Sequence, residues 1–166
     1  MQIINLIVRI RLFTIIATTL STNLVSQCDW MKLSKNDFWA MSSMFVSGFS
    51  DGTSELIKWD YESFEKYYGD SNDEWWNPDI SWKNKYKNGD QNQGAAFFGS
   101  RTFLVGVTDG YHAARSLRNL SLTATLFLVP RQEFNFKRFV FRMIVYTLAN
   151  RAGFHLAYSF PRYLNK

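Results

Sequence analysis

Hydrophobic side chains recur every three or four residues along much of this chain, and this spacing predicts amphipathic helices. The first predicted helix runs from Phe38 to about Tyr68 and has its N-cap at Asn36-Asp37. Gly48 and Gly52 interrupt its middle. Because glycine weakens a helix by about 1 kcal/mol relative to alanine, two glycines here indicate close helix packing or a kink.

The second half of the chain contains two further helical stretches. One begins at Ser100 or Thr102 and extends as far as residue 129, either unbroken or in two pieces. The other runs from about Phe136 to Phe160, and Pro161 is predicted to end it because proline cannot donate a backbone hydrogen bond. The predicted fold class is therefore all-α: a small hydrophobic bundle of three to four helices.

Residues 69–99 fit neither a helix nor a regular strand. Turn-forming residues are frequent, and the run WWNPDISWKNKYKNGD lies in the centre of the segment. Structureless loops of about 30 residues are uncommon in compact domains. The aromatic content is not typical of a disordered linker. We therefore predict a long, ordered, aromatic loop.

The aromatic loop has two interpretations. In the first, its tryptophans clamp the loop onto the helix ends and cover the bundle; we favour this for the tryptophans themselves. In the second, the loop forms a contact surface for a sugar, a lipid headgroup or a peptide. The predicted contact surface consists of Trp75, Trp76, Asp79, Trp82, Lys83, Asn84 and Lys85.

Each long helix also carries one polar stripe within a largely apolar sequence. Acids four residues apart mark the first helix, Asp109 precedes His112 by three residues in the second, and an arginine precedes a histidine by four residues in the last. Side chains at these spacings share one helix face. If the stripes face one another, the bundle encloses a polar interior site made of Asp51, Glu55, Asp109, His112, Arg151 and His155.

The Asp109-x-x-His112 spacing is also one by which helix bundles present metal ligands. Further ligands from Asp51, Glu55 and His155 would suit iron, manganese or zinc. A carboxylate-bridged di-metal site needs two acid-x-x-His pairs, and this sequence has one. We favour the alternative that these residues form ordinary ion pairs and packed core contacts. The sequence therefore identifies no cofactor.

The first 26 residues are typical of a secretory signal peptide. Arg9 and Arg11 precede an apolar run over residues 12–20, and small and polar residues then lead to a cleavage site before Gln27. A lipoprotein-type cleavage before Cys28 and an uncleaved N-terminal anchor are the alternatives.

The remaining residues, 27–166, are predicted to form a single helical domain. Cys28 is the only cysteine, so no disulfide can form within the chain. None of the helices has the 18 uncharged residues that are typical of a transmembrane helix. Segments 120–129 and 139–158 are still apolar enough to lie on or partly in a bilayer, and a spanning bundle with its charges turned inward is an alternative.

The formal net charge is +5 and aromatic residues make up 17 % of the chain. The basic residues are scattered and no nucleic-acid-binding motif is present, so we expect no nucleic-acid partner. The sequence also lacks a nucleophile elbow, a phosphate-binding loop and a metalloprotease helix motif.

The blocks WWNPDISWKNKYKNGD, FFGSRTFLV and TDGYHAARSLRN, after a start that ends in SQCDW, resemble a group of small bacterial envelope proteins without an established activity. The resemblance extends from about Asp37 to Tyr158. It implies an exported or membrane-associated helical protein.

Our first interpretation is therefore an exported, membrane-associated helical protein of the cell envelope with an interaction or assembly role. Its partner would be membrane lipid or an envelope protein, and the aromatic loop is the predicted contact surface. The alternative is a small metal-dependent hydrolase or oxygenase with a polar site inside the bundle.

Overall fold

The computed structural model describes residues 29–69, 72–129 and 134–165. The predicted signal peptide, residues 1–26, lies outside these ranges. Within them the chain forms helices and turns and no β-strand, which confirms the all-α class. The longer helices are α2 (Lys35–Trp59), α3 (Tyr61–Tyr68), α6 (Gly110–Leu128) and α7 (Phe136–Leu164).

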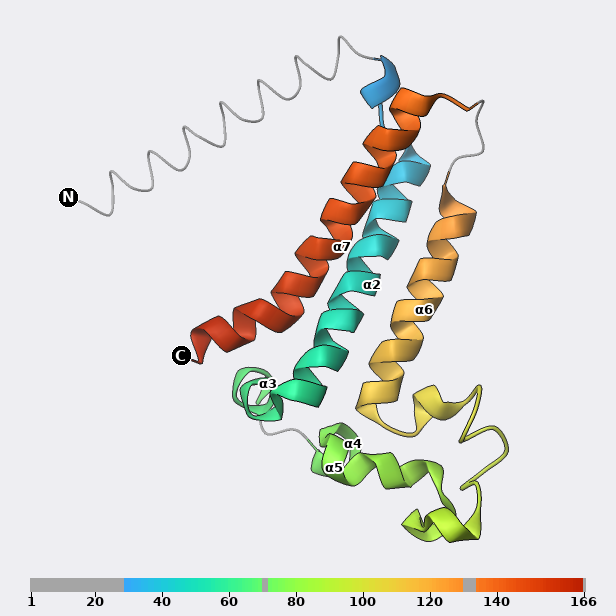
Figure 1. Cartoon of the computed structure of the whole chain (residues 1–166), viewed down its shortest axis with the longest axis vertical. Coiled ribbons are helices and arrows are strands. Elements are labelled where there is room, and N and C mark those ends of the chain that lie inside the picture. The colour runs from blue at the N-terminus through green and yellow to red at the C-terminus, as the bar shows by residue number, and fades with distance from the viewer. Residues whose placement is uncertain (1–28, 70–71, 130–133, 166) are drawn as a thin grey trace, which may run out of the picture.

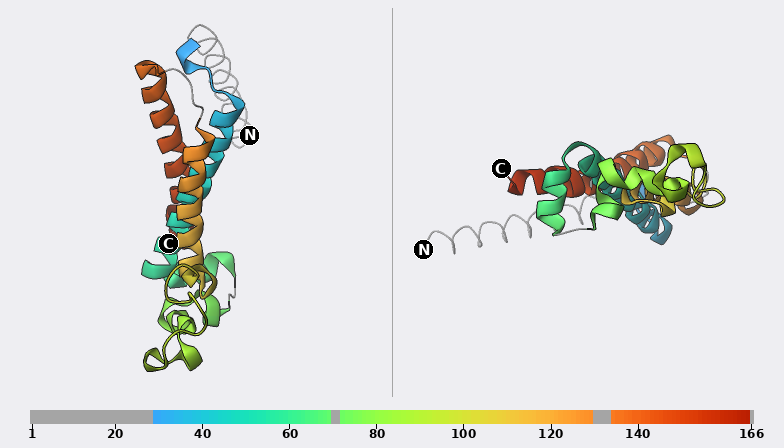
Figure 2. Two further views of the ribbon diagram at one scale, coloured as in Figure 1. Left: turned by 90° about the vertical axis from the view of Figure 1, so that its right-hand side faces the viewer. Right: turned by 90° about the horizontal axis from the view of Figure 1, so that it is seen from below.

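The three long helices lie side by side, with α2 in the middle, α7 along one side and α6 along the other (Figure 1). We call this arrangement the three-helix layer. The N-terminal ends of α2 and α7 lie at the same end of the layer as the C-terminal end of α6, together with a short 3-10 helix, η1 (Asp29–Met31). The segment between α3 and α6 lies at the opposite end (Figure 2).

Glycines bring α2 and α7 into close contact. A Cβ atom added at Gly48 would overlap the backbone of Asn150, and one added at Gly52 would press on the backbone of Phe154. From the other side, a Cβ at Gly153 of α7 would overlap the carbonyl oxygen of Phe45. The close-packing interpretation of Gly48 and Gly52 is therefore confirmed: only residues without a side chain allow the two backbones to approach this far.

Hydroxyl groups occupy much of the remaining interior of the layer. Ser47, Ser50 and Ser54 of α2 are buried, as are Ser121 and Thr125 of α6. These small side chains let helices pack closely, and the hydroxyls of Ser54 and Thr125 donate to carbonyl oxygens of their own helices.

Large hydrophobic side chains form only a small core, at the end of the layer next to α3. Leu56, Ile57 and Phe64 are buried together, and Tyr61, Trp76, Tyr111 and Tyr158 pack around them. In addition, the buried hydrophobic residues are Ala40, Ala114, Tyr146 and Ala157. Most of the large apolar side chains of the described residues therefore lie outside this core.

The helix boundaries differ from the predicted ones at the first long helix. The N-cap of α2 is Ser34, whose side chain accepts a hydrogen bond from the backbone of Asp37, while the Asp37 carboxylate accepts from the backbone of Ser34 in a capping box. The predicted N-cap, Asn36-Asp37, lies inside the first turn. Asp60 then separates α2 from α3. Its backbone is not helical, and its side chain caps α3 by accepting a hydrogen bond from the backbone of Ser63.

The later boundaries also differ. The second predicted helix begins at Gly110 rather than at Ser100 or Thr102, because Asp109 is its N-cap. The last helix continues through Pro161 to Leu164. A proline so close to the end removes only one helix hydrogen bond. Beyond it, Arg162 pairs with Asp60, which helps hold the last turn in helical form.

The described residues of the aromatic loop are ordered and contain short helices. We call residues 72–108 the cap; it comprises α4 (Asp73–Trp76), α5 (Pro78–Ser81) and the 3-10 helices η2 (Trp82–Lys85), η3 (Lys87–Gly89), η4 (Gln91–Gln93) and η5 (Val105–Val107). Asn84 joins its two ends, since its side-chain amide donates to the carbonyl oxygens of Glu74 at 2.7 Å and Thr108 at 3.0 Å.

Candidate functional site

The structure does not bring the six residues of the predicted interior site together. Asp51 pairs with Arg118 of α6 at 2.7 Å and is partly exposed. Glu55 accepts a hydrogen bond from the indole of Trp59 on its own helix. Arg151 and His155 lie on α7 as exposed residues. The polar stripes therefore face different surroundings, because small residues rather than charged ones occupy the helix contacts.

Asp109 and His112 are the one predicted pair that the structure does bring together. The Nδ1 atom of His112 lies 2.7 Å from Oδ2 of Asp109, and the backbone N–H of His112 donates to Oδ1 at 2.8 Å. The Thr108 hydroxyl donates to the same carboxylate. This is the geometry of a helix cap. The described residues hold no group of three or more His, Cys, Asp or Glu side chains arranged for a metal ion.

Burial by itself would raise the pKa of the Asp109 carboxyl. The hydrogen bonds from the side chain and backbone of His112, the positive charge of that imidazole when protonated, and the Thr108 hydroxyl outweigh burial and lower the pKa overall. The carboxylate is therefore held in its ionised form as the cap of α6.

The residues of the predicted loop surface have divided roles. Trp76 packs against Phe64 with ring centroids 5.3 Å apart and lies against Gly110 at the start of α6, which is the contact that the clamp interpretation predicts. Trp75 packs against Trp76, whereas the contacts of Trp82, with Tyr86 and the carbonyl oxygen of Asp79, lie within the cap. Asn84 donates to the backbone carbonyls of Glu74 and Thr108 near the two ends of the cap, so its amide is structural. The ammonium of Lys83 lies over the ring of Trp82.

A buried ion pair that the sequence analysis did not single out links α2 to α7. The carboxylate of Asp37 is 0 % exposed and lies 2.7 Å from Nε of Arg142. The hydroxyl of Tyr146 donates to the same carboxylate at 2.6 Å, and the hydroxyl of Ser34 donates to it at 2.7 Å. The partners are 105 residues apart in sequence, so no local spacing could have paired them.

The pKa values of this cluster follow from its hydrogen bonds. Burial would raise the pKa of Asp37, but the hydrogen bonds from Tyr146, from the backbone and hydroxyl of Ser34, and from Arg142 lower it overall. Burial and the adjacent Asp37 carboxylate together raise the pKa of Tyr146. The cluster therefore contains an ionised carboxylate, a guanidinium and a neutral phenol.

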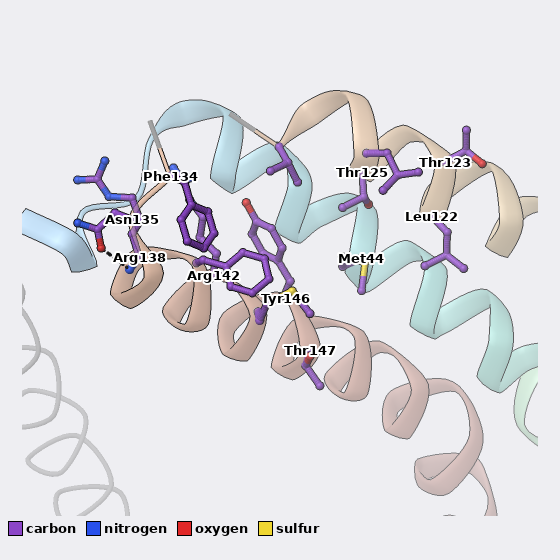
Figure 3. Close-up of a pocket in the computed structure, with 14 residues that line it drawn as sticks. Met44, Leu122, Thr123, Thr125, Phe134, Asn135, Arg138, Arg142, Tyr146 and Thr147 are labelled. Carbon is purple, nitrogen blue, oxygen red and sulfur yellow. Dashed lines mark hydrogen bonds between the residues drawn. The ribbon is translucent and has the colours of Figure 1, made fainter. Parts of the chain in front are cut away.

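An apolar groove of about 520 Å³ lies beside this ion pair. Its walls come from the C-terminal half of α6 and the N-terminal half of α7, and Met44 contributes from α2 (Figure 3). Leu122, Leu126 and Met143 are among the apolar lining residues, while Arg142 and Tyr146 belong both to the groove and to the ion-pair cluster.

Large apolar side chains cover much of the outside of the three-helix layer. Leu126 and Phe127 on neighbouring positions of α6 are 76 % and 77 % exposed. We call the following exposed residues the apolar surface: Phe38, Trp39, Phe45 and Val46 of α2; Leu117, Leu120, Leu126 and Phe127 of α6; and Phe136, Phe139, Met143, Ile144 and Leu148 of α7. A soluble monomer rarely exposes large contiguous apolar patches.

Across the described residues, no helix combines the length and the apolar character that a membrane crossing would require. In comparisons with known proteins, no family model, no curated protein and no solved structure matched the chain.

Proposed function

We propose that this chain is an exported, membrane-associated helical protein of the cell envelope, with an interaction or assembly role. Its apolar surface is in contact with lipid. The single observation that carries the proposal is the distribution of side chains in the three-helix layer, where small and hydroxylated residues lie between the helices and large apolar residues point outward.

This distribution is costly in water. A fully exposed Leu, Ile or Phe forgoes about 1.5–3 kcal/mol of burial free energy, and the apolar surface contains many such side chains. In lipid this cost disappears, since the surroundings are as apolar as the side chains, and helix association then depends on close van der Waals packing and polar contacts. The glycine contacts between α2 and α7 and the buried Asp37–Arg142 pair are contacts of these two kinds.

Export is supported by the N-terminal sequence. Arg9 and Arg11 before the apolar run at residues 12–20 are typical of a signal peptide, and cleavage before Gln27 would leave the described domain intact. The cap would then serve as the part that meets other envelope molecules. Lys83, an exposed residue whose ammonium lies over the ring of Trp82, would contribute to that surface.

The test measures lipid contact at single positions of the full chain. In a Cys28→Ser background, Phe127→Cys, Ile144→Cys and, as a control, Phe98→Cys are labelled with an environment-sensitive fluorophore. Phe98 is the matched control because it is 87 % exposed but lies in the cap. We expect a blue-shifted emission with phosphatidylcholine vesicles at positions 127 and 144 and little change at position 98. The same emission at all three positions would contradict lipid contact of the apolar surface.

A separate experiment tests export. The expressed chain is fractionated, and the N-terminus of the membrane-bound form is sequenced. We expect the protein in the membrane fraction of the envelope, beginning at Gln27. A chain that begins at Met1 and stays in the cytoplasmic fraction would contradict export.

A further inference from the structure

The groove between α6 and α7 has the size and the shape of a site for one flexible chain. Its volume of about 520 Å³ lies within the range of about 300–1,000 Å³ that is usual for small-molecule sites. Along α7, the lining residues extend from Arg138, next to the N-cap residue Asn135, to Thr147 at the other end (Figure 3). At 1.5 Å per residue, the nine helical steps from Arg138 to Thr147 correspond to roughly 14 Å along the helix.

The lining is suited to hydrocarbon over most of its length. Leu122 and Leu126 on α6 lie across from Phe139 and Met143 on α7. None of the described residues that line the groove is acidic, and two of them are cationic: Arg142, whose charge is balanced by Asp37, and Arg138. A ligand that fills this groove should therefore combine an apolar chain with a negative charge.

The positive charge lies at the end of the groove where η1 crosses α7. The guanidinium of Arg138 donates to the carbonyl oxygen of Asp29 at 2.8 Å, which fixes the side chain at this end. A guanidinium has five donors in a planar fork and suits carboxylate and phosphate groups. Among the described residues at this end of the layer, cations outnumber anions in formal charge: Lys32, Lys35, Lys137, Arg138 and Arg142 against Asp29 and Asp37.

We propose that the groove binds a long-chain fatty acid, with its acyl chain between α6 and α7 and its carboxylate at Arg138. The inference rests on the proposed function in one respect, which is that the membrane supplies the ligand. The net positive charge at this end of the groove favours an anionic headgroup, and the groove has room for one acyl chain. Arg142 lines the groove, and its ion pair with Asp37 keeps α2 and α7 in place beneath the chain.

The test uses a dodecanoate derivative with a photoreactive diazirine in the chain, added to the full-length protein in phosphatidylcholine nanodiscs. After irradiation, mass spectrometry identifies the labelled residues. We expect adducts on buried residues that line the groove, such as Thr125 and Tyr146. A probe with the same chain and a trimethylammonium head should label these positions at least about tenfold less, because it lacks the charge-assisted hydrogen bonds that a carboxylate makes.

Two neighbouring pairs of variants separate the groove from the rest of the helix surface. Met143→Trp fills the groove, while Ile144→Trp adds the same ring at an exposed position that does not line it. Arg138→Gln removes the proposed carboxylate partner, while Lys137→Gln removes the adjacent charge. We expect labelling to fall about tenfold in the first member of each pair, as for the loss of one charge-assisted hydrogen bond, and to change less than about twofold in the second.

Chain length provides an independent readout. Competition by unlabelled fatty acids should become about fourfold stronger for each added methylene, until the chain fills the groove, and should then level off. A partition into bulk lipid would continue to increase with length. If Met143→Trp does not fold as judged by circular dichroism, Thr147→Trp at the other end of the groove replaces it.

The possible outcomes distinguish this inference from the proposed function. Adducts spread over the outer faces of the three helices, with no difference between Met143→Trp and Ile144→Trp, would overturn the groove assignment and leave membrane contact intact. Equal labelling by the cationic probe would likewise overturn it. Groove-specific labelling without a blue shift at position 127 would support the fatty-acid site and contradict the proposed function.

Discussion

Removing the cation of the buried ion pair should destabilise the fold far more than removing an exposed one. In Arg142→Leu, the Asp37 carboxylate stays fully buried and loses the two guanidinium contacts, at 2.7 Å and 3.0 Å. Breaking a buried pair by removing one partner costs about 3–5 kcal/mol, because the other charge is left uncompensated. Asp37 retains its hydrogen bonds from Tyr146 and Ser34, so we expect a loss near the lower end, about 3 kcal/mol.

Arg162→Leu is the matched control. Arg162 also lies on α7 and also pairs with an aspartate at 2.7 Å, but both partners of this pair are partly exposed. Exposed pairs contribute about 0–1 kcal/mol. Unfolding of both variants by urea in a neutral detergent, followed by circular dichroism, gives the two free energies of unfolding.

A second variant tests the cause of the loss. In Asp37→Asn with Arg142→Leu, the buried charge is gone while the side-chain amide can still bond to Ser34 and Tyr146. We expect this double variant to be more stable than Arg142→Leu by about 1–2 kcal/mol, because no uncompensated carboxylate remains. The reasoning would be refuted if Arg142→Leu lost no more than Arg162→Leu, or if the double variant were less stable than Arg142→Leu.

Three further predictions concern other parts of the chain. Gly48→Ala should destabilise by about 1–3 kcal/mol in urea unfolding, because the new Cβ overlaps the α7 backbone, whereas Gly94→Ala, in open space at φ +83°, should cost about 1 kcal/mol. The pKa of Asp109 is lower in the folded than in the unfolded chain, so the ionised carboxylate stabilises the fold fully above the unfolded value near 3.8. This stabilisation is lost as pH falls through the lower folded pKa. The free energy of unfolding, measured from about pH 5 to pH 2, should therefore fall less in Asp109→Asn than in the unchanged protein. Asn84→Ala removes two hydrogen bonds that close the cap and should speed its limited proteolysis, whereas Asn92→Ala, which loses one exposed side-chain bond to Asp90, should not; equal rates would contradict the role of Asn84.

The helical class could be predicted because hydrophobic periodicity is a local property. The helix ends were less predictable, because capping depends on which of several polar residues takes the extended conformation. Ser34, three residues before Asp37, has the spacing of a capping box, and that signal was present in the sequence. The same holds for Asp109 before His112, a spacing that fits both a metal-ligand pair and an N-cap.

The arrangement of the polar residues could not be read from spacing. The predicted interior site requires the polar helix faces to meet inside the bundle, as they do in a water-soluble protein. In the three-helix layer, Gly48 and Gly153 bring α2 and α7 so close that no charged stripe fits between them at that level. The Asp37–Arg142 pair depends on the packing of two helices that lie far apart in sequence, and periodicity carries no information about such a contact.

The outward orientation of the large apolar residues also explains why polar contacts recur along the layer. Apolar side chains that point away from the neighbouring helix cannot fix its register, so the register must come from contacts between the helices themselves. The chain places such contacts at each level: Arg142 with Asp37 near one end, Asn150 donating to the carbonyl oxygen of Met44 at 3.1 Å in the middle, and Arg162 with Asp60 at the other end. Contacts of this kind keep their strength in an apolar medium, where hydrophobic burial between helices contributes nothing. A helix layer held in this way would therefore stay paired when lipid replaces water around it, which is what contact of the apolar surface with a membrane requires.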